Sequence, residues 1–269
     1  MISAKILADS RHPSNGSRLT TFELTYPRFI HSELMTHRKF SRNSASSRAI
    51  PTSVLLEQVK TNPVIPIHWG RLQSGMQATQ ELGLASQQQA EYLWLKLRDD
   101  AVKNVELLYD LKLHKQIVNR LLEPWMWITV VATSDNYGLQ NFFKLRCHEA
   151  AEPHIRLLAN RMRNEYETNM PLTLQVGEWH SPYSDDIIVS VARCARLSYL
   201  NQLGKLVDGK RVAWSKADDY ALHDRLASMG HWSPFEHQAE CCDPIIGGSN
   251  FGDGWFQYRK TFKGEDGCS

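Results

Sequence analysis

The sequence lacks several features that mark whole classes of protein. Its 269 residues include only five cysteines, without the spacing of a zinc site, a pattern that fits a reducing compartment: Cys147, Cys194, Cys241, Cys242 and Cys268. No run approaches the roughly 18 apolar residues of a membrane helix. The residues after Met1 contain no apolar core of a signal peptide. We therefore expect a cytoplasmic protein with no metal site and no membrane partner.

The composition gives no reason to expect a polyanionic partner. The net charge is +2, and the contents of 42% hydrophobic and 22% charged residues are ordinary for a soluble globular protein. A small anionic substrate needs only a local group of cations. The length allows one or two domains. Because no internal repeat or low-complexity segment divides the chain, we expect a single domain over residues 1–269.

Periodicity predicts the elements of the first half of the chain. An apolar strand is expected over residues 19–26, followed by a helix over 27–39. Residues 50–83 contain prolines and glycines and predict an extended excursion with short helices. Apolar residues recur at helical spacing over 85–122, which predicts two helices that break near 111–114.

Capping and turn residues predict the elements of the second half. Pro153 suits the first turn of a helix. Asp208-Gly209 is typical of a hairpin turn. Ser215 and Gly230 fit the start and the end of another helix. A final strand is expected over 255–262.

The most informative segment is residues 36–48, T-H-R-K-F-S-R-N-S-A-S-S-R. It places the guanidinium groups of Arg38 and Arg48 within reach of an imidazole, an amide and several hydroxyls. Arginine offers a planar fork of donors, and serine and asparagine adapt to the oxygens that remain. Such a segment can hold phosphate and carbonyl oxygens. Read alone, it is equally compatible with a solvated basic loop or with a nucleic-acid contact.

Two further segments add chemistry at a distance. Residues 141–156 read N-F-F-K-L-R-C-H-E-A-A-E-P-H-I-R, and Arg120 precedes them in R-L-L-E-P. Residues 230–237 read G-H-W-S-P-F-E-H. Taken singly, Arg120 fits a charge on a helix surface, Arg146 fits an ion pair at a helix end, and the histidines of 230–237 fit local capping groups.

Together these segments resemble the flavin-dependent thymidylate synthase family. The order H-R-x-x-S-x-N-x-x-S-x-R in 36–48 is similar to the family signature, and N-F-x-x-L-R and G-H-x-S-P-F-E-H match two more of its motifs. The chain departs from the family pattern at five positions: Glu33, Thr36, Ser44, Ala150 and Glu152.

The order of the motifs predicts a circular permutation. In the family, the motif found here at 230–237 precedes the arginine signature by one strand, whereas here it follows it by almost two hundred residues. Residues 192–199 resemble the family's opening strand. We therefore expect 231–237 to pack near 37–48. The expected fold is α+β, a mixed or antiparallel sheet flanked by helices, with a helix-rich segment at about 85–170.

The resemblance implies a reaction and its site residues. A one-carbon unit would pass from methylenetetrahydrofolate to carbon 5 of dUMP, with FAD as cofactor and NADPH as reductant, in a homotetramer. The implied catalytic residues are Arg146, Ser46 and His231. The implied substrate-binding residues are Glu33, Ser46, Ser47, Arg48, Arg120 and Arg146. The implied cofactor-binding residues are His37, Arg38, Asn43, Asn141, His231, Ser233 and Glu236.

Several alternatives stay open at this point. Ser46 has no adjacent general base in the sequence, so it is expected to bind substrate rather than to attack it. The departures are also compatible with a related pyrimidine C5 methylase or hydroxymethylase. Glu33 would offer an acceptor to the amine of cytosine, or it would pair with an arginine of a neighbouring helix. Two alternatives are not enzymes: a flavin- or nucleotide-binding protein without turnover, and a nucleic-acid-binding protein.

Overall fold

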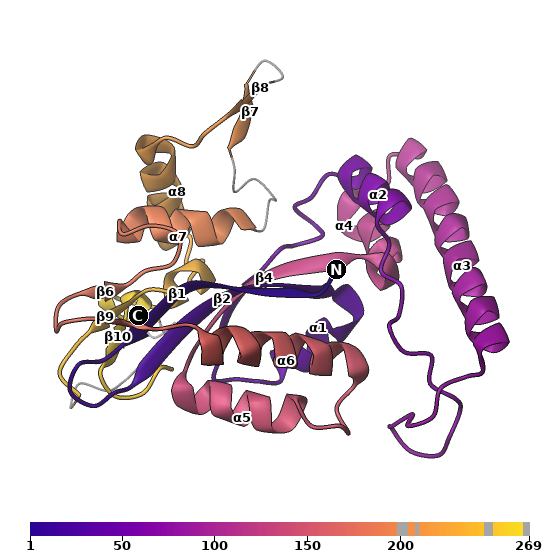
Figure 1. The fold of residues 1–269 in the computed structure, drawn as a ribbon. Helices are drawn as coiled ribbons and strands as arrows, with labels where there is room; N and C mark the ends of the chain where they lie inside the picture. Colours follow the sequence, from indigo (N-terminus) through magenta and orange to yellow (C-terminus); the bar gives the residue numbers. More distant parts are fainter. Residues whose placement is uncertain (198–203, 208–209, 245–249, 266–269) are drawn as a thin grey trace.

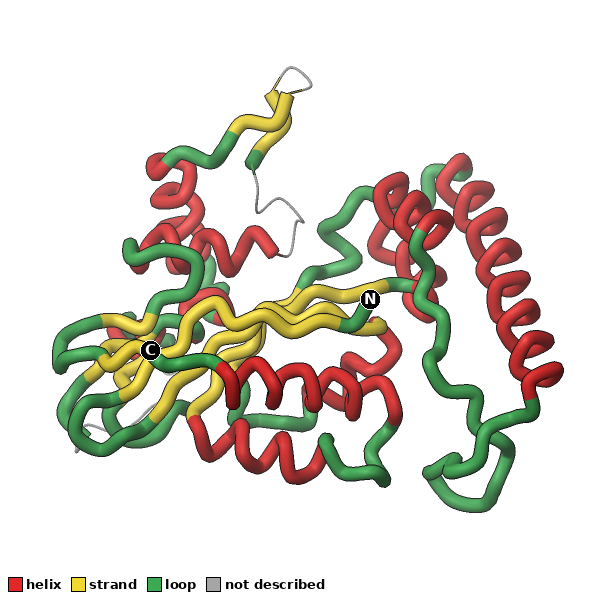
Figure 2. Tube along the Cα trace, viewed as in Figure 1, coloured by secondary structure: helices red, strands yellow, loops and turns green. Residues whose placement is uncertain are grey.

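The computed structural model describes residues 1–197, 204–207, 210–244 and 250–265. A five-stranded sheet runs through the middle of the molecule, with helices against both faces (Figures 1 and 2). Its strands in spatial order are β3 (Ser41–Ser44), β4 (Trp127–Asp135), β2 (Arg18–Pro27), β1 (Ser3–Arg11) and β5 (Leu172–Thr173). Neighbours are antiparallel except β1 and β5, which are parallel. This mixed sheet flanked by helices confirms the predicted α+β class.

The sequence predicts one long strand of this sheet well and misses its neighbour. The strand expected over 19–26 is β2, which extends by one residue at each end. The strand β1 was not expected. Its last residues are polar, and the buried Asp9 pairs with Arg18 of β2 at 2.6 Å and accepts hydrogen bonds from Thr20 and Asn169. Where buried polar residues are paired with a neighbouring strand, the alternation of apolar and polar residues that predicts a strand is weak.

One face of the sheet is covered by three helices: α1 (His31–Met35), α5 (Asn136–Arg146) and α6 (Pro153–Thr168). The main core lies here and includes Phe22, Leu24, Phe142, Leu158 and Met162, all nearly inaccessible. Pro153 lies in the first turn of α6, as predicted. The helix predicted over 27–39 is shorter: a 3-10 turn, η1 (Arg28–Ile30), leads into α1, which ends at Met35.

A second cluster of helices lies beyond the end of the sheet (Figure 1). It consists of α2 (Thr52–Thr61), α3 (Leu84–Asp110), α4 (Lys115–Val118) and the 3-10 helix η2 (Asn119–Trp125). Their own apolar core includes Leu55, Val105 and Leu122. The predicted break near 111–114 is confirmed, because Lys112 takes a left-handed φ of 62° between α3 and α4. The excursion expected over 50–83 contains α2 and then irregular chain.

The C-terminal segment packs on the other face of the sheet. Its elements are β6 (Trp179–His180), α7 (Ile187–Arg196), β7 (Lys205–Val207), β8 (Lys210–Val212), α8 (Lys216–Ser228), the 3-10 helices η4 (Ser233–Glu236) and η5 (Tyr258–Thr261), β9 (Ala239–Cys241) and β10 (Trp255–Gln257). The strand predicted over 192–199 is wrong. Residues 187–196 form α7, because Asp186 caps the backbone N–H groups of Ile188 and Val189.

Other predictions for this segment are confirmed in part. Ser215 caps α8 through a capping box with Asp218, and Gly230 follows its end with a φ of 68°. The turn at Asp208-Gly209 lies outside the described residues. The final strand predicted over 255–262 stops at Gln257, where η5 begins.

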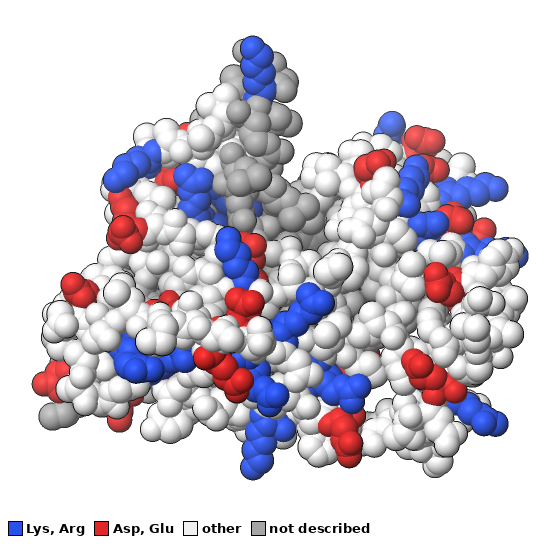
Figure 3. All heavy atoms as spheres, viewed as in Figure 1, with Lys and Arg blue, Asp and Glu red and all other residues white. Residues whose placement is uncertain are grey.

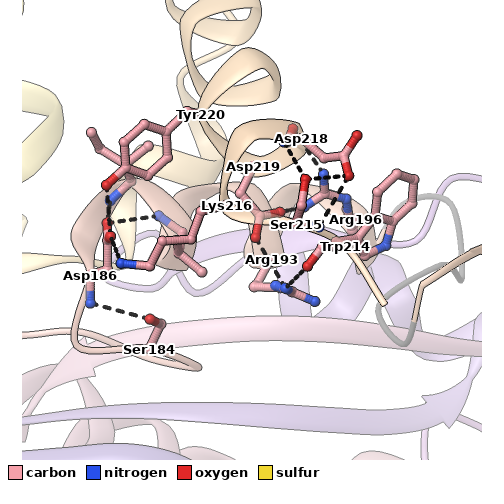
Figure 4. Close-up of polar contacts among 12 residues, drawn as sticks. Ser184, Asp186, Arg193, Arg196, Trp214, Ser215, Lys216, Asp218, Asp219 and Tyr220 are labelled. Carbon is pink, nitrogen blue, oxygen red and sulfur yellow. Dashed lines mark hydrogen bonds and ion pairs between the residues drawn. The ribbon is translucent and has the colours of Figure 1, made fainter. Parts of the chain in front are cut away.

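Buried charges join α7 to α8 (Figure 4). The Asp219 carboxylate, 1% exposed, pairs with Arg193 at 3.0 Å and also with Arg196. The Arg196 guanidinium lies 4.0 Å from the centre of the Trp214 ring. These contacts neutralise one buried carboxylate with two cations, so removing Asp219 would leave two arginines without their counter-ion.

Three general expectations can be compared with the described part of the chain. Cys147, Cys194, Cys241 and Cys242 are all free. In the described ranges, no helix combines the length and the apolar character needed to cross a bilayer. On the face drawn in Figure 3, cations and carboxylates are intermingled rather than gathered into one basic patch.

Candidate active site

The signature segment, residues 36–48, turns from the end of α1 into the edge strand β3. The His37 ring packs edge-on against Phe142 of α5, with centroids 4.8 Å apart. Phe40 also packs against the Phe142 ring, with centroids 5.1 Å apart. These aromatic contacts fix the signature segment on α5 and bring Arg146, the last residue of that helix, to the end of α1.

Arg146 contacts three residues at the end of α1. Its Nε donates to Nε2 of His37 at 2.8 Å, and its Nη1 donates to Oε2 of Glu33 at 3.2 Å. Its Nη2 donates to Oγ1 of Thr36 at 3.3 Å and to the Glu33 carbonyl at 3.5 Å. A guanidinium has five N–H donors. Four are engaged by residues that the structure describes, and among these residues one N–H on Nη1 has no acceptor.

The surroundings set the charge of this cluster. Burial, together with the charges of Arg146 and Arg42, lowers the pKa of His37 to about 4. His37 is therefore neutral at pH 7. Burial raises the pKa of Glu33, and the nearby Glu152 adds to this rise, while Arg146 opposes it. One of the two expectations for Glu33, that it pairs with an arginine of a neighbouring helix, is confirmed by its contact with Arg146.

Sequence reasoning passed over Arg42, which lies inside the signature segment. Its Nη1 donates to three carbonyl groups: Leu34 at 3.4 Å, Met35 at 2.7 Å and His37 at 3.2 Å. The only signal for this role was its position in a short strand, where successive side chains point to opposite faces. Asn43, the next residue, accordingly points to α7 and η4.

The residues expected to hold phosphate lie on the loop after β3 and on η2. Asn119 of η2 donates to the carbonyls of Ser47 at 2.7 Å and Ile50 at 3.0 Å, which fixes the loop after β3. Arg48 and Arg120 follow Ser47 and Asn119 in the sequence, and both are exposed. The structure therefore brings the loop of Ser46–Arg48 to the element that carries Arg120.

The predicted contact between 231–237 and 37–48 is confirmed within one chain. Ser233 Oγ donates to Asn43 Oδ1 at 3.2 Å, and Asn43 Nδ2 donates to the Cys194 carbonyl at 2.6 Å. The C-terminal motif thus lies directly against the signature strand β3.

The residues expected to bind cofactor fall into two sets. His37, Asn43 and Glu236 make contacts inside the chain, the last through an ion pair with Arg259. Ser233 is exposed although it donates to Asn43. The side chains exposed and without a hydrogen bond to the described residues are Arg38, Asn141 and His231. These exposed donors are the ones that fit the phosphates and amide groups of a dinucleotide.

A buried chain of hydrogen bonds also ties the C-terminal segment to the sheet. Ser10 contacts His180 at 2.8 Å, His180 contacts Thr21 at 2.7 Å, Thr21 contacts Thr133 at 2.7 Å, and Thr133 contacts His237 at 2.9 Å. Burial lowers the pKa of His180 to about 4 and that of His237 to about 3. Both rings are therefore neutral at pH 7.

Comparisons with known proteins agree with this geometry. Residues 7–172 match a family model described as thymidylate synthase complementing protein, and this is more than half of the chain. The chain belongs to this family. Its members are flavin-dependent thymidylate synthase-like methyltransferases, so the protein is an enzyme of that kind. The matched range contains the signature segment, Arg120 and Arg146, and it ends before the motif at 230–237.

Solved structures add the fold. The UMP/dUMP methylase PolB from Streptomyces cacaoi, bound with 5-Br UMP, is 16% identical, with a TM-score of 0.52 over 64% of this chain and 90% of that chain. The flavin-dependent thymidylate synthase ThyX from Helicobacter pylori, complexed with FAD and dUMP, is 16% identical, with a TM-score of 0.39 over 55% of this chain and 67% of that chain. A search of curated sequences finds no match.

Proposed function

We propose that the protein methylates carbon 5 of dUMP, with FAD as cofactor, methylenetetrahydrofolate as the one-carbon donor and NADPH as reductant. Family membership supports the reaction class. The observation that carries the proposal is Arg146, held at the end of α1 by Glu33, Thr36 and His37, with one N–H that no described residue accepts. Such a fixed cation is what a developing negative charge on a pyrimidine ring requires.

Each group of residues has a part in this reaction. Carbon 5 of uracil is a poor nucleophile, and Arg146 stabilises the enolate-like form by donating to a ring carbonyl. Arg48 and Arg120 bind the phosphate, and Ser46 and Ser47 add hydroxyl donors. FAD, when bound, supplies the hydride. Its phosphates and ring amides would be held by Arg38, Asn141, His231 and Ser233.

The base is proposed to be uracil rather than cytosine. Glu33 would favour the amine of cytosine only if its carboxylate faced the ligand alone. Its Oε2 instead lies 3.2 Å from Arg146 Nη1. The pair therefore offers a donor next to an acceptor, which fits the carbonyl at carbon 4 and the N3–H of uracil. Because such a pair would also fit the amine and N3 of cytosine, the choice of uracil rests on family membership.

The arrangement of the chain supports two more proposals. The family motif at 230–237 lies outside the matched range 7–172, yet it contacts β3, so we infer that the chain is a circular permutant of the family order. The groups around Arg146 and around Arg48 occupy different elements. We therefore propose a homotetramer in which neighbouring subunits complete each site.

An absorbance spectrum and a tritium assay test the function. The purified protein should show the two flavin bands, and nucleotide should be methylated when dUMP, methylenetetrahydrofolate and NADPH are present. Release of tritium from carbon 5 of labelled dUMP measures the reaction. A colourless protein that binds no FAD and releases no tritium would contradict the proposal.

A further inference from the structure

Arg42 occupies an unusual position beside the site. It lies in β3, and its Nη1 atom contacts the carbonyls of Leu34, Met35 and His37 at 3.4, 2.7 and 3.2 Å. These carbonyls lie at the C-terminal end of α1 and just beyond it, and those of Leu34 and His37 also accept the backbone N–H groups of His37 and Phe40. One guanidinium nitrogen therefore fixes the backbone that leaves the helix.

The same stretch of backbone carries every partner of Arg146. Glu33 lies one residue before Leu34, Thr36 lies between Met35 and His37, and His37 itself accepts the hydrogen bond from Arg146 Nε. A shift of residues 34–37 would move all three partners together. Arg42 thus holds the backbone at residues 34, 35 and 37. Arg146 contacts the side chains of Glu33, Thr36 and His37 in the same stretch, and also the Glu33 carbonyl.

We propose that Arg42 is a positioning residue: by holding the backbone of residues 34–37, it sets the orientation in which Arg146 meets the pyrimidine base. This inference rests on the proposed function, in which Arg146 binds that base. Arg42 touches no reacting atom. It acts through the segment between β3 and the end of α1.

The charge that faces Arg42 supports this role. Arg42 is half-buried, and burial lowers its pKa, while the Glu236 carboxylate opposes that shift. Glu236 belongs to the motif at 230–237 and also pairs with Arg259. The C-terminal motif therefore places a carboxylate among the charges that act on Arg42.

The contacts predict which substitution is tolerated. All three hydrogen bonds of Arg42 leave from one nitrogen, and a lysine ammonium can also donate to several carbonyls from one nitrogen. Arg42→Lys should therefore keep dUMP affinity within about threefold. Arg42→Gln should weaken it by roughly ten- to a hundredfold, because it misplaces Arg146, whose charge-assisted hydrogen bond to the base is worth about that much. Arg163→Gln, which removes an exposed arginine of α6, is the matched control and should change nothing.

Two measurements separate positioning from general damage. The first is a double substitution: because Arg42 acts through Arg146, dUMP should bind R42Q/R146Q no more weakly than R146Q. The second is the pKa of His37, followed by NMR. It should stay near 4 in R42K, which keeps the charge, and rise in R42Q, where the charge of Arg42 and the contact with Arg146 are both lost while burial still lowers it.

Each outcome decides the question. Three results would overturn the role of Arg42. They are a dUMP affinity in the double variant that is weaker than in R146Q, an unchanged affinity in R42Q, or a loss of affinity in R42K equal to that in R146K. If R42Q does not fold, R42K alone still decides it through affinity and the His37 pKa. If wild-type protein binds no dUMP, the proposed function fails, whereas the His37 measurement still tests the link between Arg42 and Arg146.

Discussion

Arg146 Nε donates a hydrogen bond to His37 Nε2 at 2.8 Å, across 109 positions of sequence. Arginine has donors only, so this contact requires a lone pair on Nε2 and places the imidazole proton on Nδ1. Protonation of His37 would remove the acceptor and place two cations together. The cluster of His37, Glu33, Thr36 and Arg146 is therefore built around a neutral histidine.

The first prediction concerns Arg146. Its contacts to the end of α1 leave from three different nitrogens, so Arg146→Lys cannot reproduce them with a single ammonium. We expect Arg146→Lys and Arg146→Ala to weaken dUMP binding by roughly ten- to a hundredfold, the worth of one charge-assisted hydrogen bond. Calorimetric titration with dUMP measures this, and the flavin spectrum should be unchanged. Wild-type affinity in the lysine variant would remove Arg146 from the site.

The second prediction concerns the base. Because family membership favours uracil, wild-type protein should release tritium from carbon 5 of labelled dUMP and not from dCMP. Glu33→Gln keeps an oxygen acceptor for Arg146, so it should reduce release from dUMP by less than about tenfold. Glu33→Ala, which removes that acceptor, should reduce it more. Release from dCMP alone by the wild type would show that the carboxylate selects cytosine.

A third prediction follows from the buried histidines. The pKa of His180 is near 6.5 in the unfolded chain, and burial lowers it to about 4 in the folded chain. Between these values the unfolded state binds more protons, so stability is full above about pH 6.5 and falls toward pH 4. Asp9 faces His180 and opposes part of the shift. His237, lowered to about 3, acts in the same direction.

Urea unfolding at pH 7, 6 and 5 measures this effect. Each buried histidine contributes a slope of up to about 1.4 kcal/mol per pH unit in this range. His180→Gln should lower the free energy of unfolding at pH 7. It should also reduce the slope of that free energy against pH, because about one proton fewer is taken up on unfolding. Equal stability of the wild type at pH 7 and pH 5 would show that these rings are not held neutral.

The features that could be predicted from the sequence are those set by motifs and by interactions between neighbouring residues. The motifs predicted the neighbourhood of the site, because Asn43 and Ser233 do meet. Local signals also gave the cap of α8 at Ser215 and the break near Lys112. The role of Arg42 could not be read, since it depends on a turn that folds the strand back on α1.

Other failures have a similar cause. The segment 192–199 has apolar residues that suit a strand or a helix, and the cap at Asp186 decides for the helix. The strand β1 depends on Arg18 to neutralise Asp9, a contact between strands. The contact of His37 with Arg146 was likewise not expected, because it depends on the packing of α5 on the signature segment. Each of these outcomes is set by tertiary contacts.

The fourth prediction tests that packing at Gly138. A Cβ atom there would lie 2.1 Å from Ser134 Oγ and 3.0 Å from Lys39 Cβ, so alanine must displace the signature segment or the start of α5. We expect Gly138→Ala to cost about 1–3 kcal/mol of stability and to weaken FAD binding. Gly83→Ala is the control, because its Cβ would meet no atom within 4 Å. A Gly138→Ala protein as stable as the control would mean that α5 and the signature do not pack so closely.

The last prediction concerns the order of the chain. If 230–237 and 36–48 form one site whatever their order, joining Ser269 to Met1 and opening the chain elsewhere should preserve the fold. The opening belongs between Met170, which is 88% exposed, and Pro171. A Gly/Ser linker of about 20 residues has a typical span of about 25 Å, which gives the ends room to join. The contact between Ser233 and Asn43 should then form as before.

Melting temperature and bound FAD measure the result. The reordered protein should keep the flavin spectrum and dUMP affinity of the original, because the contacts between the C-terminal motif and β3 do not depend on which segment comes first. Opening the same joined chain between Thr133 and Ser134 is the control. That cut lies inside β4, which pairs with both β2 and β3, so this protein should not fold. Failure of both openings alike would show that the present order of the motifs is required.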